Sequence, residues 1–143
     1  MSQLHAIHRD LFERGVTLFN RGDYFEAHEV WEDLWHDRSF PERRFVQGLI
    51  QLAVGLYWLR RGNLIGARRL FQRADDNVAP FRPFCLGVRI GPLFDQARAN
   101  QRHVETVLLE RYGPQAEAFD RTRPLVPLPE PPKIVLDHRP TDD

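Results

Sequence analysis

The stretch Tyr24–Trp35, YFEAHEVWEDLW, combines an apolar helical face with a cluster of ionisable side chains. Asp23 precedes it and Glu26 follows three residues later, a spacing typical of a capping box at the start of a helix. At about 100° per residue, one broad face of this helix is apolar. Its members are Tyr24, Ala27, Val30, Trp31, Leu34 and Trp35. We therefore predict an amphipathic helix capped by the Asp23 side chain.

Four ionisable residues lie at the margin of this apolar face: His28, Glu29, Glu32 and His36. His28 and Glu32 are four residues apart, so they lie on the same side of a helix, as two metal ligands must. Glu29 lies a third of a turn away and is placed to act as a general base. The pattern is H-E-x-x-E, without the second histidine of the H-E-x-x-H zinc motif, and no third ligand is evident. It indicates a divalent-metal site with His28 and Glu32 as ligands and Glu29 as catalytic base.

Two other interpretations fit the same residues. Ionisable groups beside a buried face must be paired, and arginines are available for Glu29 and Glu32, while Gln51 could bond His28. Those arginines are Arg44, Arg68 and Arg69. Such a network would fix helix packing without any chemistry. The third interpretation is a pocket for a small ligand or a partner, lined by Trp35, Arg44, Gln47 and Gln51.

Apolar periodicity predicts four further helices, about Leu4–Asn20, Pro41–Arg61, Leu64–Val78 and Pro92–Tyr112. The predicted helix Pro41–Arg61 is apolar on most sides, with a narrow polar strip of Arg44, Gln47 and Gln51. Gly48 and Gly55 flank this strip, which indicates either close contact with another backbone or a flat pocket floor. The segment 79–91 reads as a turn-rich, irregular connection.

The two predicted hairpins repeat each other at an offset of 40 residues. Gly22 aligns with Gly62, Ala27 with Ala67 and Trp31 with Phe71, so turn and core positions are shared. This predicts a pair of stacked helix–turn–helix units of the tetratricopeptide sort. The polar positions are not repeated, because His28, Glu29 and Glu32 align with Arg68, Arg69 and Gln72.

The C-terminal quarter is rich in proline, with seven prolines from Pro114 onward. Its segment LVPLPEPPKIVL predicts an extended, polyproline-like arm wrapped over the surface. We therefore expect an all-α protein with a single helical domain, residues 1–113, and an arm, residues 114–143. The last residues, 138–143, are expected to be loose.

The composition of the chain argues against several classes of function. The chain has 143 residues, and its 20 basic and 20 acidic residues leave no basic excess, which argues against nucleic-acid binding. Its most apolar run, Phe45–Leu59, is too short and too polar to span a bilayer, and the N-terminus does not resemble a secretory signal. The single cysteine, Cys85, rules out an internal disulfide and favours the cytoplasm. It lacks a nearby His/Asn partner motif, so we do not expect it to be a nucleophile.

The string FNRGDYFEAHEVWEDLW, followed by QGLIQLAVGLYWLRRGNLIGARRLF, resembles a bacterial and archaeal family catalogued as domain of unknown function 309. The resemblance covers roughly Leu11–Val78. It implies a small all-helical fold, and family-level descriptions imply a metal-dependent hydrolase. The motif positions that carry over are His28, Glu29, Glu32, Trp35, Gln47, Gly48 and Gln51.

Two functions from different classes thus remain open. One is a hydrolase in which His28 and Glu32 bind a divalent metal and Glu29 activates water. The other is a non-catalytic helical-repeat module that binds an unknown partner or forms a homodimer beside the helix at Tyr24–Trp35, with a structural His/Glu network.

Overall fold

The structure, a computed structural model, describes residues 6–115 and 126–137. It contains five α-helices, as predicted, and the all-α class is confirmed. They are α1 (Ala6–Asn20), α2 (Tyr24–Trp35), α3 (Arg43–Arg60), α4 (Leu64–Val78) and α5 (Ile90–Tyr112). Two short 3-10 helices, Ala79–Phe81 and Gly113–Gln115, follow α4 and α5. The predicted loose tail, 138–143, and the arm residues 116–125 lie outside the described residues.

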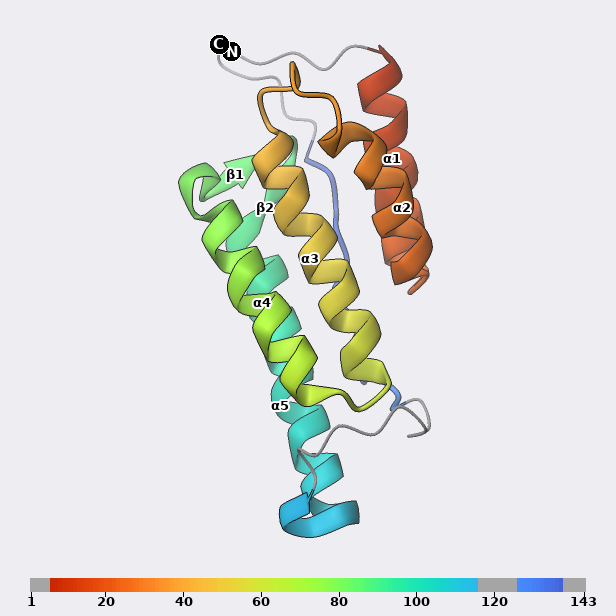
Figure 1. The fold of residues 1–143 in the computed structure, drawn as a ribbon, viewed down its shortest axis with the longest axis vertical. Helices are drawn as coiled ribbons and strands as arrows, with labels where there is room; N and C mark the ends of the chain where they lie inside the picture. Colours follow the sequence, from red (N-terminus) through yellow and green to blue (C-terminus); the bar gives the residue numbers. More distant parts are fainter. Residues whose placement is uncertain (1–5, 116–125, 138–143) are drawn as a thin grey trace.

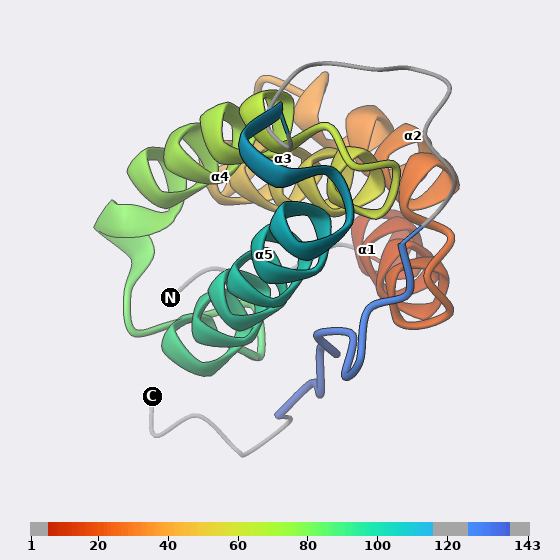
Figure 2. The same cartoon turned by 90° about the horizontal axis from the view of Figure 1, so that it is seen from below.

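The helices form two layers. Figure 2 shows α4, α3 and α2 side by side on one side of the bundle, with α5 and α1 on the other. The same five helices are labelled in Figure 1. Within the first layer α3 is central, because it packs against both α2 and α4. We call the solvent-facing side of the α2–α3–α4 layer the outer face.

The central helix α3 is the buried helix that the run Phe45–Leu59 predicts. Nine of its residues are buried: Phe45, Val46, Gly48, Leu49, Leu52, Ala53, Gly55, Leu56 and Leu59. None of the helices in the described parts of the chain has both the length and the apolarity to cross a bilayer.

The two glycine turns are built in the same way, which confirms the predicted hairpins. Gly22 and Gly62 have φ values of 83° and 79°, a left-handed conformation that glycine adopts without strain. The amide after each glycine bonds back to the preceding helix, Asp23 N to Leu18 O at 2.9 Å and Asn63 N to Trp58 O at 2.9 Å. Both hairpins thus end their first helix with the same hydrogen-bonded turn.

The predicted cap at Asp23 is wrong. Asp23 is the N-cap of α2, but its side chain accepts no capping hydrogen bond. At the equivalent position of the second hairpin, the Asn63 side chain accepts a bond from Gly66 N at 2.9 Å. The backbone carbonyl of Asp23 still accepts the amide of Ala27, so α2 begins there without help from the carboxylate.

A glycine packs against a buried aromatic ring in each hairpin. Gly15 on α1 lies against the indole of Trp31 on α2, and Gly55 on α3 lies against Phe71 on α4. Both pairs occupy equivalent repeat positions. A Cβ on Gly55 would lie 2.6 Å from Phe71 Cε1, and one on Gly48 would lie 2.5 Å from Val78 Cγ1. The glycines of α3 therefore serve close helix packing, the first of the two predicted roles, and not the floor of a pocket.

The connection between α4 and α5 contains a small hairpin where the sequence predicts irregular structure. Strands β1 (Phe84–Cys85) and β2 (Val88–Arg89) pair antiparallel, with Cys85 opposite Val88. Leu86 and Gly87 have φ values of 50° and 82°, as the two central residues of a tight hairpin turn require. The chain then enters α5 two residues earlier than predicted, because Pro92 is tolerated within the first turn, where an amide has no helical partner.

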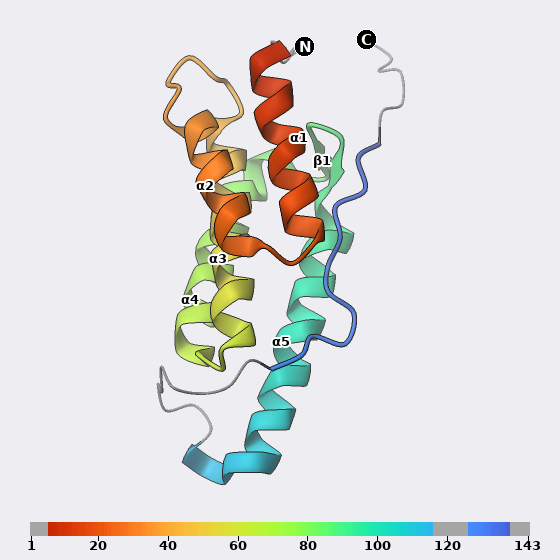
Figure 3. The ribbon, with the colours of Figure 1, turned by 90° about the vertical axis from the view of Figure 1, so that its right-hand side faces the viewer.

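The C-terminal arm, residues 126–137, runs along α1 and α5 in the second layer (Figure 3). It forms neither helix nor strand, and its buried residues Pro132 and Ile134 alternate with exposed ones. Asn20 holds it with two bonds, from its Nδ2 to Ile134 O at 2.9 Å and from Ile134 N to its Oδ1 at 2.8 Å. The extended arm is thus part of the packed core, rather than a covering of the surface alone.

Substitution of Gly55 by alanine tests the close packing of α3 on α4. Alanine gains about 1 kcal/mol of helix propensity, but a methyl group in a filled core typically costs about 1–3 kcal/mol. We expect Gly55→Ala to lower the free energy of unfolding by about 1 kcal/mol, measured by urea denaturation. Gly91→Ala is the matched control, because nothing lies within 4 Å of the added Cβ. Equal stability of the two variants would contradict the packing argument.

Candidate functional site

His28 and Glu32 lie together on α2, as their spacing predicts. His28 Nε2 is 3.7 Å from Glu32 Oε2, and the other ring nitrogen, Nδ1, lies 2.6 Å from the carbonyl oxygen of Phe25. The Glu32 side chain is 44% exposed. The pair is therefore a half-exposed contact within one helix, with the imidazole orientation fixed by the backbone of the preceding turn.

The donors around this pair do not complete a metal site. Zinc sites use at least three protein ligands, and catalytic ones add a water. Within residues 6–115 and 126–137, no group of three or more His, Cys, Asp or Glu side chains could hold a metal ion. Glu29, the predicted base, is exposed, and its side chain contacts no ionic or hydrogen-bonding partner in these ranges. The described residues thus bring His28 and Glu32 together and add no third ligand.

The residues predicted to line a pocket lie on different sides of α3. Trp35 contacts Arg43, whose guanidinium carbon lies 4.9 Å from the indole centroid and whose Nε donates to Trp35 O at 2.9 Å. Arg44 and Gln51 instead face α4, where both bond the side chain of Asn77, at 3.1 and 2.7 Å. Gln47 is half-buried on the same helix and bonds none of them.

The buried network predicted for Glu29 and Glu32 also takes a different form. Arg68 pairs with Glu105 on α5 at 2.8 Å, and Arg44 donates to Asn77 and to the backbone of Asp76. Gln51 is bonded to Asn77 and not to His28. Arg44 and Arg68 therefore hold α4 against α3 and α5, whereas Arg69 and the acidic groups of α2 remain at the surface.

The outer face has opposite charge on its two flanking helices. On α2 the exposed residues Glu26, Glu29 and Asp33 are acidic, whereas on α4 the exposed Arg69 and Arg73 are basic. Glu29 and Asp33 align with Arg69 and Arg73 in the repeat. None of these five side chains forms an ion pair within the part of the chain that the structure describes.

Half-buried residues of α3 lie between the two charged helices. Val54 and Trp58 follow each other by one helical turn on the side of α3 away from its buried residues. At the end of α2 nearest to them, Phe25 is 46% exposed and its ring lies 5.6 Å from that of Tyr57. The outer face thus has Val54 and Trp58, with the half-buried Gln47, between an acidic α2 and an α4 that carries Arg69, Arg73 and the exposed Asp76.

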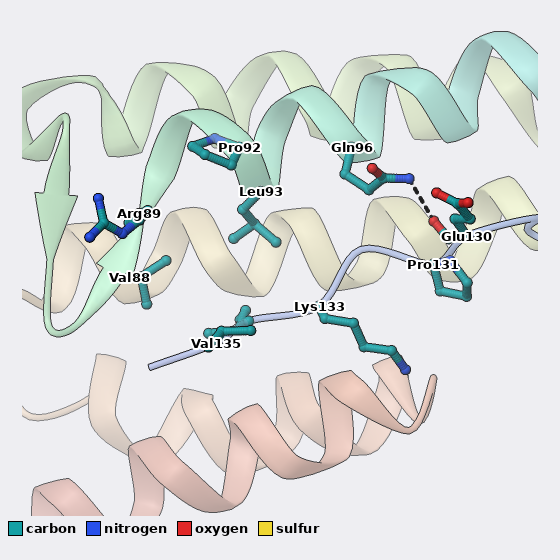
Figure 4. Close-up of a pocket in the computed structure, with 10 residues that line it drawn as sticks. Val88, Arg89, Pro92, Leu93, Gln96, Glu130, Pro131, Lys133 and Val135 are labelled. Atoms are coloured by element: carbon teal, nitrogen blue, oxygen red, sulfur yellow. Dashed lines mark hydrogen bonds between the residues drawn. The ribbon is translucent and has the colours of Figure 1, made fainter. Parts of the chain in front are cut away.

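Two cavities on the second layer are completed by the arm, and sequence reasoning missed both. Figure 4 shows the first, of about 350 Å³, between α5 and the arm, where Gln96 donates to the carbonyl of Glu130 at 2.7 Å. The second, of about 390 Å³, includes Arg60 and Lys133. The partners are far apart in sequence, so only the apolar run Ile134, Val135 and Leu136 indicated that the arm packs on the bundle.

Cys85 has no chemical activation in the structure. Burial, and to a lesser extent the charge of Glu42, raise the pKa of its thiol to about 12. The thiol is therefore protonated at neutral pH, and a protonated thiol is a poor nucleophile. This agrees with the expectation that Cys85 has no catalytic role.

Substitution of Glu32 measures how much the His28 contact contributes to stability. Exposed pairs four residues apart on a helix contribute about 0.3–0.5 kcal/mol. We expect Glu32→Gln to change the free energy of unfolding by no more than about 0.5 kcal/mol, with Glu29→Gln as the control for an exposed, unpaired carboxylate. A loss of about 1.5 kcal/mol or more for Glu32→Gln alone would mean that the carboxylate supports a buried network.

The region that contains the His28 motif is similar to known proteins. Residues 12–70 match the model of a family described as "Domain of unknown function (DUF309)". The chain is also similar to "Uncharacterized protein YpuF" of Bacillus subtilis (strain 168), with 51% identity over 88 residues. The matched part is 59% of this chain and 51% of that protein, so the chain spans about half the length of this relative. No solved structure matches the chain. Residues 12–70, which contain both glycine turns and the His28 motif, therefore match the family that the sequence resembles.

Proposed function

We propose that the protein is a non-catalytic helical interaction module, of tetratricopeptide-like construction, that pairs with a second copy of itself through the outer face. The observation that carries this proposal is the opposite charge at equivalent repeat positions, acidic at Glu29 and Asp33 and basic at Arg69 and Arg73. These charges have no ionic partner among the described residues, although arginines elsewhere on α3, α4 and α5 are bonded.

The arrangement is self-complementary under a two-fold axis. If two copies face each other across a two-fold axis that runs parallel to α3 and between the copies, the acidic α2 of each copy lies opposite the basic residues of α4 of the other. Such an isologous contact uses the same patch twice and closes as a dimer. The half-buried Val54 and Trp58 then form the apolar centre, and the charges form a complementary rim that fixes the orientation.

The competing function is a metal-dependent hydrolase at His28, Glu29 and Glu32. Here the pair His28–Glu32 is the supporting observation, at 3.7 Å on one helix. Titration of tag-free protein with zinc and with manganese decides between them. Stoichiometric binding that is lost in His28→Ala would support the hydrolase, whereas weak, non-stoichiometric binding supports the interaction module.

A cytoplasmic site of action remains our expectation, because a single cysteine suits a reducing compartment.

Two charge-reversal variants test the pairing. Glu29→Arg with Asp33→Arg makes α2 basic, and Arg69→Glu with Arg73→Glu makes α4 acidic. Each variant alone places like charges across the two-fold axis, so we expect its dimer dissociation constant to rise by at least about tenfold. A mixture of the two variants restores opposite charges at both contacts, and we expect it to form heterodimers. Sedimentation equilibrium at low and high salt measures the dissociation constant of each variant and of their mixture.

Glu110→Arg is the control, because Glu110 is an exposed acidic residue on α5, away from the outer face. It is expected to dimerise as the unmodified protein does. The pairing is refuted if the unmodified chain is monomeric at all concentrations. It is also refuted if the mixed variants associate no more tightly than each variant alone.

A further inference from the structure

Among the described residues, the cavity that includes Arg60 and Lys133 is lined by three cationic side chains and by no carboxylate. It lies where the end of α1 meets the end of α3 and the arm, and its third cation is Arg21. No Asp or Glu is among the ten described residues that line it. A volume of about 390 Å³ is in the range of small-molecule sites. The cavity therefore has both the size and the charge to hold a small anion.

Two of the cations also stabilise the end of α1. Lys133 Nζ donates to Asn20 O at 2.6 Å, and Arg60 Nη1 donates to Gly22 O at 3.0 Å. A cation at a helix C-terminus is favourable because it interacts with the negative end of the helix dipole, with or without a ligand nearby. Arg21 does not share this role, because its side chain is exposed and bonds no described residue. The charge at the cavity thus exceeds what the end of α1 uses.

Tyr24 supplies a neutral hydrogen-bond donor at the cavity. The residue is 2% exposed and lines the cavity, yet its hydroxyl makes no hydrogen bond to any described residue. The hydroxyl itself is not among the buried polar atoms that lack a partner, so it is open to water or to a ligand in the cavity. Burial raises the pKa of Tyr24, and the nearby Arg60 lowers it by less, so the hydroxyl stays protonated at neutral pH. It is therefore available as a hydrogen-bond donor.

We propose that this cavity binds the oxyanion group, a phosphate or a carboxylate, of a small molecule. Arg21, Arg60 and Lys133 supply the positive charge, and the Tyr24 hydroxyl donates a hydrogen bond to the oxyanion. The arm forms an apolar part of the wall, which accommodates the body of the ligand and consists of Val126, Pro127, Leu128 and Pro131. The site lies away from the outer face and does not depend on the pairing proposed above.

Titration of the full chain with phenyl phosphate, benzoate and benzyl alcohol tests this assignment. Amide resonances of Gly22 and Val126, followed by NMR, report binding at the cavity. We expect phenyl phosphate or benzoate to shift them in a saturable way, and the uncharged alcohol to leave them unchanged. The more tightly bound of the two anions identifies the oxyanion.

Two variants separate binding from folding. Tyr24→Phe removes only a hydroxyl that bonds no described residue, so we expect the melting temperature to stay the same and the dissociation constant to rise about tenfold. Arg21→Gln is expected to weaken binding to a similar degree, whereas Arg9→Gln, an exposed arginine on the same helix, leaves it unchanged. Failure of both anions to bind at millimolar concentration would overturn the proposal. Unchanged affinity in Tyr24→Phe and Arg21→Gln would overturn it as well.

Discussion

The contact between a helical glycine and a buried aromatic ring is the constraint on which this structure depends. Gly15 admits Trp31 in the first hairpin, and Gly55 admits Phe71 in the second. Without a Cβ, the two helices of each hairpin can approach closely enough to bury a large ring between them. The Trp31 indole also donates to Phe12 O at 3.1 Å, so burial leaves no polar group unpaired. Because the second hairpin repeats the contact, the same geometry brings α4 against α3.

Because the two hairpins pack in the same way, their surface residues also lie in equivalent positions. Once the core positions are fixed, the exposed positions of α2 and α4 stand in equivalent places and can differ in charge without cost to the fold. The chain has Glu29 and Asp33 on α2, and Arg69 and Arg73 at the equivalent places on α4. Surface charges that bond no neighbour contribute little to stability. Their separation onto two flanking helices is therefore better explained by recognition than by folding, which supports the proposed pairing.

The sequence predicted those features that local chemistry determines. Left-handed glycines mark the turns, and apolar periodicity placed α4 at its observed bounds and the other helices within a few residues of theirs. The sequence did not predict the β-hairpin, because Leu86 occupies a central turn position that normally favours Gly, Asn or Asp. Nor did it predict the arm-lined cavities. Those depend on contacts such as Asn20 with Ile134, which join segments more than 100 residues apart.

At the candidate site, the sequence predicted a contact within one helix but not the contacts between helices. The i, i+4 spacing correctly placed His28 beside Glu32, because both residues belong to one helix. The partners on α3 were harder to place, since a helix between two neighbours must direct its side chains to either side. Arg44 and Gln51 face α4 and bond Asn77, and thus do not reach His28. The predicted roles of His28, Glu29 and Glu32 in metal chemistry stay predictions.

Disulfide trapping between copies tests the central claim, that the acidic α2 of one chain meets the basic α4 of another. In a Cys85→Ser background, chains carrying Glu29→Cys are mixed with chains carrying Arg69→Cys and oxidised slowly. The proposed two-fold arrangement predicts that the mixed 29–69 disulfide forms faster than the 29–29 and 69–69 disulfides. A statistical mixture of all three, or a predominance of 29–29, would contradict it.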